Sequence, residues 1–146
     1  MAQALARLAA ALDFRIVVVD DRRDLADPLV FGDKVQLTFG DIPQTIRELE
    51  PDESSWIVIV TRGHTNDLDA LRALAPRDLR YVGLIGSRAK VARISDQLLS
   101  EGMPGEVLKQ VHAPIGLDIG AVTPQEIAVS ILAELIAVKH GKRSEE

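Results

Sequence analysis

Four short runs rich in β-branched and other apolar residues, separated by polar turns and by segments of helical periodicity, constrain the fold of this chain more than any other feature. The runs cover residues 14–19, 35–39, 56–60 and 81–85. Continuous β-branched runs of this length are typical of strands buried on both faces of a parallel sheet. Because parallel strands must be joined by right-handed crossovers, the sequence predicts a doubly wound α/β fold.

The segments between the runs read as helices. Helices are predicted over about residues 2–12, 42–49, 67–74, 87–102, 104–111 and 124–139. Thr123 is expected to cap the last of these, and residues 141–146 are expected to fray. Because no linker or repeat divides the chain, residues 1–146 are predicted to form one α/β domain.

Composition excludes several classes of function. The 146 residues include no cysteine, so disulfides, thiolate zinc sites and thiol catalysis are ruled out, and a cytoplasmic location is expected. A net charge of -5 with no basic face argues against a nucleic-acid partner. No apolar run approaches the ~20 residues of a membrane helix. The three histidines lack metal-ligand spacing, so no metal site is predicted.

In open α/β sheets ligands bind beyond the carboxyl ends of the strands, so the turns that leave the strands are the candidate sites. The first is "VVVDDRRD", in which Asp20 and Asp21 follow a predicted strand directly. In a dinucleotide fold an acid residue here accepts hydrogen bonds from a ribose hydroxyl. The alternative is that the two carboxylates only end the strand and cap the next segment.

The second turn is "TRGHTND", where polar side chains follow the third strand. Gly63 permits a tight turn that presents Thr61, Arg62 and His64. Arg62 is suited to a phosphate or carboxylate, and His64 to a hydrogen bond or to proton transfer. The alternative is an ordinary polar loop, with Asp67 as the cap of the next helix.

The third turn is "GLIGSRAK", where Gly86 and Ser87 lead from a strand into a helix. Arg88 and Lys90 lie in the first turn of that helix, where the helix dipole disfavours cations. Free backbone N–H groups and two cations together favour a bound anion there. A solvated helix face is the alternative interpretation.

The fourth turn, "PIGLDIGAVTPQ", places Asp118 between two glycines ahead of the last helix. Asp118 is of functional interest only if this loop folds over the strand ends. The glycines have a simpler explanation, which is a close passage of the loop along the sheet.

Taken together and in order, these turns resemble the C-terminal Rossmann-like domain of the XdhC/CoxI family, the xanthine dehydrogenase accessory factors. The matching segments include "TRGH", "GLIGSR" and "PIGLDIG" and span nearly the whole chain. The resemblance implies a Rossmann-like three-layer sandwich with a mostly parallel sheet. The site positions that it carries over are Asp20, Asp21, Arg22, Thr61, Arg62, Gly63, His64, Gly86, Ser87, Arg88, Lys90 and Asp118.

The same resemblance implies a function. Family members are described as binding molybdenum cofactor and supporting its sulfuration and insertion into xanthine dehydrogenase-type or carbon monoxide dehydrogenase-type enzymes. A non-catalytic cofactor chaperone with a molybdenum hydroxylase apo-enzyme as partner is therefore expected. Two alternatives stay open, namely an NAD(P)-binding oxidoreductase and an interaction module without a ligand.

The resemblance is incomplete at one end. In the family a separate N-terminal domain, a strand and a glycine-rich turn precede the first helix, and this sequence begins inside that strand–turn motif, with Met1 where its last residues are expected. A fragment, an alternative-start product and a natural short form all fit this observation. Because a sheet that lacks a central strand exposes an edge, the chain is also expected to form homo-oligomers.

Overall fold

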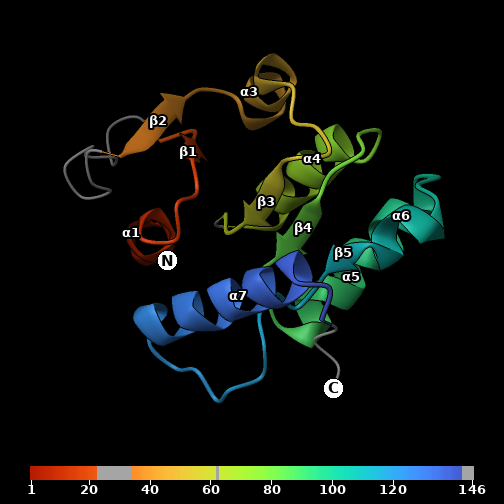
Figure 1. Ribbon diagram of the computed structural model, residues 1–146. Helices are drawn as coiled ribbons and strands as arrows, with labels where there is room; N and C mark the ends of the chain where they lie inside the picture. Colours follow the sequence, from red (N-terminus) through yellow and green to blue (C-terminus); the bar gives the residue numbers. More distant parts are fainter. Residues whose placement is uncertain (23–33, 62, 143–146) are drawn as a thin grey trace. The chain divides into compact units, whose positions relative to one another are not determined.

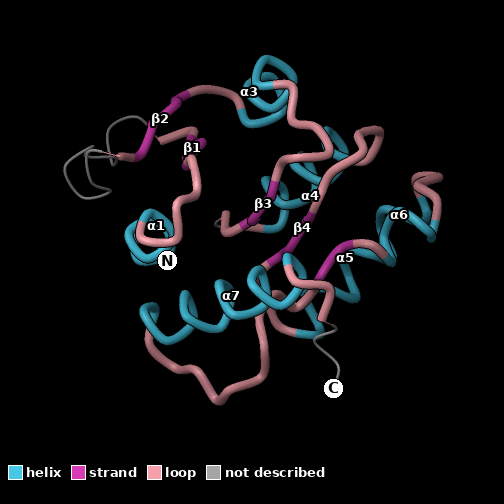
Figure 2. The backbone as a smooth tube through the Cα atoms, in the orientation of Figure 1, coloured by secondary structure: helices cyan, strands magenta, loops and turns pink. Residues whose placement is uncertain are grey.

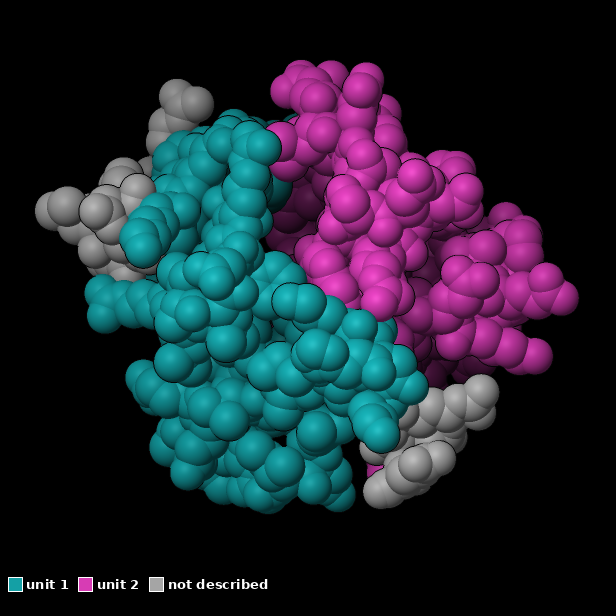
Figure 3. All heavy atoms as spheres, in the orientation of Figure 1, with its two compact units in different colours: residues 1–41, 116–146 teal, residues 42–115 magenta. Residues whose placement is uncertain are grey.

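A computed structural model describes residues 1–22, 34–61 and 63–142 of the chain (Figures 1 and 2). These residues cluster into two compact units, one formed by residues 1–41 and 116–146 and the other by residues 42–115 (Figure 3). In the described residues the strands form two sheets, and every strand pair is parallel. The predicted parallel α/β class is therefore confirmed, although the strands are divided between two sheets.

The first unit contains a two-stranded sheet and two helices. Strands β1 (Ile16–Asp20) and β2 (Val35–Phe39) pair in register from Ile16 opposite Val35 to Asp20 opposite Phe39. The expectation that β1 is buried on both faces is wrong, because Val17 keeps 36% of its surface exposed and its register partner Gln36 is exposed as well. A β-branched run thus predicted the strand correctly but not the covering of its second face.

Two helices of this unit pack together, α1 (Ala2–Ala10) and α7 (Pro124–Lys139). The buried residues of α1 are Ala6 and Ala9, whose small side chains allow a close approach. The predicted cap of α7 is confirmed as a capping box. The Thr123 side chain accepts from the Glu126 backbone N–H, and the Glu126 carboxylate accepts from the Thr123 backbone N–H.

Helix α7 is closed by two backbone hydrogen bonds just beyond its last residue. Gly141 N donates to Val138 O, and Lys142 N donates to Ala137 O at 2.7 Å. This pair of bonds closes the helix in the manner of a Schellman motif, with Gly141 in the left-handed conformation that the motif requires. The predicted fraying of residues 141–146 stays a prediction, and residues 143–146 lie outside the described residues.

The second unit contains a three-stranded parallel sheet in the order β3 (Trp56–Ile59), β4 (Tyr81–Leu84) and β5 (Val111–His112). Helix α4 (His64–Leu74) joins β3 to β4, and α5 (Arg88–Ser100) with α6 (Gly105–Lys109) joins β4 to β5. Helix α3 (Ile42–Leu49) packs against α4. The core of the unit is formed by leucines and isoleucines of α4, β4 and α5, including Leu71, Leu84, Ile94 and Leu98.

The helix predicted over residues 104–111 is too long. It ends at Lys109, and Val111 and His112 pair with Val82 and Gly83 of β4 as a short fifth strand. Pairing with an existing strand supplies hydrogen bonds that two residues at a helix end lack. Rings also stack across the sheet, with Tyr81 and His112 centroids 4.5 Å apart. Tertiary pairing, rather than local propensity, decides this boundary.

Among the described residues, no helix is both long enough and apolar enough to cross a membrane.

Candidate functional site

The carboxyl ends of β3 and β4 lie at one edge of the second sheet, because the two strands run parallel. Ile85 N donates to Ile59 O at 3.0 Å, which continues the pairing to the point where both chains turn into helices. Gly63, with φ of 98°, precedes α4, and Ser87 precedes α5. The predicted turns "TRGH" and "GLIGSR" are therefore neighbours in space.

A buried carboxylate joins these two turns. The Asp67 side chain has no exposed surface, and its Oδ1 accepts a hydrogen bond from the Thr61 hydroxyl. Asp67 Oδ2 has no hydrogen-bond partner within the described residues, but it lies 2.6 Å from Lys90 Nζ in an ion pair. Asp67 thus connects the end of β3 to the first turn of α5.

The expectation that Asp67 caps a helix beginning at residue 67 is wrong. Helix α4 begins three residues earlier, at His64, so Asp67 lies inside its first turn with its side chain directed into the unit. The conformation of Gly63 permits the earlier start. The structural role of Asp67 has no local signal in the sequence, because its partner Lys90 lies 23 residues away along the chain.

Lys90 was expected to attract an anion, and the structure gives its charge another partner. The ammonium group balances the Asp67 carboxylate, and 23% of the Lys90 side chain remains exposed. Gly86 leaves room for the lysine stem, since a Cβ at this position would lie 3.0 Å from Lys90 Cδ. Gly86 and Lys90 therefore act together to place the ammonium over the buried carboxylate.

Ser87 and Arg88 are exposed at the start of α5. Ser87 Oγ accepts from Lys90 N at 3.2 Å, which confirms the predicted helix start. Arg88 makes no hydrogen bond or ion pair in the parts of the chain that the structure describes. Arg88 is the first residue of α5, at the positive end of the helix dipole, and its guanidinium carries five donors. This position is suited to a phosphate or carboxylate from solution.

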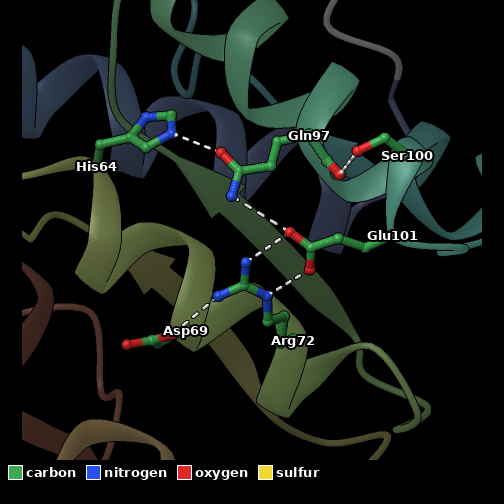
Figure 4. Close-up of polar contacts among 6 residues, drawn as sticks. All are labelled: His64, Asp69, Arg72, Gln97, Ser100 and Glu101. Carbon is green, nitrogen blue, oxygen red and sulfur yellow. Dashed lines mark hydrogen bonds and ion pairs between the residues drawn. The ribbon is translucent and has the colours of Figure 1, made fainter.

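His64, the first residue of α4, contacts α5 rather than the residues of its own turn. Its Nε2 lies 3.1 Å from Gln97 Oε1 (Figure 4). No local pattern indicated Gln97 as a partner, although it lies seven residues, or about two helical turns, beyond Lys90 on α5. Arg62, the remaining polar residue predicted in this turn, lies outside the described residues.

The other predicted residues belong to the first unit. Asp20 ends β1, and Arg22 binds its carboxylate through the backbone N–H at 2.8 Å and through Nε and Nη2 at 3.1 and 3.0 Å. This local turn is the structural role that was predicted as the alternative to ribose binding. Asp21 is exposed.

Asp118 is also exposed, in the loop before α7. That loop is attached to α7 by two hydrogen bonds, from Leu117 N to Ser130 O at 3.2 Å and from Ser130 Oγ to Leu117 O at 2.6 Å.

Several hydrogen-bonding and charged side chains lie at the β3–β4 edge. Within residues 1–22, 34–61 and 63–142, no group of three or more histidine, aspartate or glutamate side chains is placed to hold a metal ion. The edge combines an exposed cation at a helix start, hydroxyl groups and an imidazole. Such a set is suited to an anionic ligand that also carries hydrogen-bonding groups.

Comparison with known proteins identifies relatives over almost the whole chain. Uncharacterized protein YqeB of Escherichia coli (strain K12) is 37% identical over 143 residues, which cover 95% of this chain and 26% of that protein. A probable xanthine dehydrogenase subunit from Bacillus subtilis (strain 168) is 33% identical over 135 residues, covering 92% of this chain and 39% of that protein. The chain therefore spans well under half the length of these relatives.

A solved structure is similar as well. The crystal structure of a xanthine dehydrogenase from Bacillus halodurans superposes with a TM-score of 0.82 and 28% sequence identity, over 95% of this chain and 41% of that one. The model of the XdhC Rossmann domain family matches residues 1–135. The predicted resemblance is thus confirmed, and the chain belongs to the XdhC Rossmann domain family.

Proposed function

We propose that this chain is a cofactor-binding accessory domain that serves a molybdenum hydroxylase of the xanthine dehydrogenase or carbon monoxide dehydrogenase type. The observation that carries the proposal is the family match over residues 1–135, together with a relative named as a probable xanthine dehydrogenase subunit. The ligand is molybdenum cofactor, and the domain supports its sulfuration and its insertion into the apo-enzyme. The domain itself acts without catalysis.

The donor set at the β3–β4 edge fits such a ligand. Molybdenum cofactor carries a phosphate and a pterin with N–H and C=O groups, so it needs an anion partner and a set of hydrogen-bonding groups. Arg88 and the start of α5 would hold the phosphate, with Ser87 beside them. Thr61 and His64 would meet polar atoms of the pterin. When bound, the cofactor supplies an oxo-metal dithiolene centre, and the residues of this chain only bind and orient it.

A charge reversal tests the anion contact. Arg88→Glu replaces the exposed cation by an anion at the positive end of α5, so affinity for isolated molybdenum cofactor should fall by at least about tenfold, the equivalent of one charge-assisted hydrogen bond. Arg93→Glu is the matched control, because Arg93 is exposed on the same helix and the net charge change is identical. Equilibrium binding under anaerobic conditions measures both variants.

Three outcomes are possible. Weaker binding by Arg88→Glu with unchanged binding by Arg93→Glu supports the proposed site. Affinity unchanged from the parent in both variants would contradict it, and so would an equal loss in both, which general electrostatic attraction explains.

A further inference from the structure

A chain of polar contacts connects Arg72 on α4 to His64 at the start of the same helix, by way of Gln97 and Glu101 on α5 (Figure 4). We call these four residues the α4–α5 polar chain. The proposed function does not account for Arg72, Gln97 or Glu101. Each is a long side chain at the surface, so a role in the core does not explain the connection.

The first link fixes Glu101 as a hydrogen-bond acceptor. Arg72 Nε donates to Glu101 Oε1 at 2.8 Å, and Arg72 Nη2 donates to Oε2 at 2.6 Å, which is the bidentate arrangement. The hydrogen bond from Arg72 lowers the pKa of Glu101, and the same bond raises the pKa of Arg72. Asp69 adds an ion pair to Arg72 at 3.0 Å from within α4. Glu101 therefore stays a carboxylate, which can only accept.

The second link fixes the direction of the Gln97 amide. Gln97 Nε2 donates to Glu101 Oε2 at 3.2 Å, so the amide oxygen is the atom turned toward His64. The reverse orientation would place the amide oxygen against a carboxylate, where neither atom can donate. An amide oxygen only accepts, so the proton in the contact with His64 must lie on His64 Nε2. In a neutral imidazole the other nitrogen, Nδ1, then carries a lone pair.

We propose that the α4–α5 polar chain holds His64 in the Nε2–H tautomer and thereby presents Nδ1 as a hydrogen-bond acceptor for an N–H group of the bound pterin. This role rests on the proposed function. Nδ1 has no hydrogen-bond partner among the described residues, and His64 begins α4 at the carboxyl end of β3, three residues after Thr61. His64 is the binding residue, and Gln97 and Glu101 are positioning residues.

The tautomer can be tested without any ligand. Nitrogen NMR of the imidazole rings in mildly alkaline buffer distinguishes a protonated from an unprotonated ring nitrogen, and His64→Asn identifies the signals of His64 among the three histidines. The unaltered chain should show a proton on Nε2 and none on Nδ1. In Glu101→Gln the second amide can donate to Gln97, so the two amide orientations and the two tautomers should mix.

Asp96→Asn is the matched control for Glu101→Gln. It removes one negative charge from an exposed residue of the same region, and Asp96 is not part of the polar chain. The His64 signals of the Asp96→Asn variant should match those of the unaltered chain. A proton on Nδ1 in the unaltered chain, or tautomer mixing in Asp96→Asn to the same degree as in Glu101→Gln, would overturn the positioning role.

Binding of isolated molybdenum cofactor tests the second half of the proposal. His64→Leu removes the acceptor, and loss of one hydrogen bond corresponds to an affinity about three- to tenfold lower. His64→Asn keeps an amide oxygen near the position of Nδ1 and should recover part of the affinity. Gln97→Leu should weaken binding less than His64→Leu, because it frees the ring without removing it.

The results separate the two proposals. Unchanged affinity in His64→Leu, with a loss in Arg88→Glu, overturns the role of His64 and leaves the proposed function standing. No binding by the unaltered chain overturns the proposed function and with it the assignment of Nδ1 to a pterin N–H. Circular dichroism of each variant confirms that the chain is folded in every comparison.

Discussion

Replacing Asp67 by asparagine removes the charge that joins the two turns of the candidate site. The carboxylate has no exposed surface, and Lys90 Nζ lies 2.6 Å from its Oδ2. Asparagine is nearly isosteric, so the packing around residue 67 is preserved and the loss is mainly electrostatic. The amide oxygen can still accept from the Thr61 hydroxyl, which limits the effect to the ion pair and to a weakening of that one hydrogen bond.

The expected magnitude follows from the burial of the two partners. Removing one member of a buried ion pair costs about 3–5 kcal/mol, because the remaining charge is left uncompensated. Lys90 retains 23% exposure of its side chain and can turn partly into water, which moves the estimate for Asp67→Asn to the bottom of that range or slightly below it. Asp67→Asn should therefore reduce the free energy of unfolding by about 2–3 kcal/mol. Lys90→Met leaves the buried Asp67 carboxylate without a partner charge, so the free energy of unfolding should fall by about 3–5 kcal/mol.

The double variant sharpens the prediction. When both charges are removed, neither is left buried without a partner, so the combined loss should be smaller than the sum of the single losses by about 1–3 kcal/mol. Lys109→Met serves as the control for the loss of a lysine, because Lys109 is exposed on α6. It should change stability by no more than about 0.5 kcal/mol.

Urea unfolding followed by tryptophan fluorescence is the assay. Trp56 is the single tryptophan of the chain and lies in β3, the strand that leads to Thr61 and its turn. A loss of 2–3 kcal/mol lowers the urea midpoint by about 1 M or more at ordinary slopes. Single variants that both fall within about 0.5 kcal/mol of the parent, or single losses that simply add, would refute the reasoning.

Two further predictions concern α7. Gly116→Ala places an alanine at a φ of 98°, which is strained, and sets its methyl group against Ser130 Oγ. The free energy of unfolding should fall by about 2–4 kcal/mol, measured by thermal unfolding followed by circular dichroism. A gain in stability would show that the loop can move away. Backbone N–H groups of Thr123 and Val122 lower the pKa of Glu126, so its contribution to stability is present above the ordinary glutamate pKa of about 4.3 and is lost as the pH falls through the folded value. The stability difference between the parent and Glu126→Gln should accordingly shrink on acidification, and a difference independent of pH would contradict the capping role.

Local chemistry made most of the fold predictable. The strand at Val35–Phe39 was located with its correct ends, and Thr123 was identified as a helix cap. In each case the signal lies within a few residues of the structure it specifies. Strand β5 was missed because two residues carry no periodicity, and only pairing with β4 makes Val111 and His112 a strand.

The candidate site was predictable only in part, for a related reason. A turn that follows a buried strand can be located from sequence, and the turns at Thr61 and Gly86 do meet at one sheet edge. The role of each side chain there depends on partners far along the chain. Asp67 was assigned to a helix cap and Lys90 to an anion, yet the two bind each other. Charge pairing between elements has no local signature, so a cation in a helix start cannot be assigned to a ligand from its position alone.

This pairing divides the β3–β4 edge into two parts with different consequences for mutation. Asp67 and Lys90 neutralise each other, so their loss should appear first as lower stability. Arg88 and His64 lie outside that pair, so their loss should appear as weaker ligand binding in a chain of nearly unchanged stability. If the same residues both stabilised the fold and bound the ligand, every mutation that weakened binding would also destabilise the chain. Here the same α5 carries both cations two residues apart, and the buried carboxylate beneath Lys90 is what leaves Arg88 as the proposed anion partner.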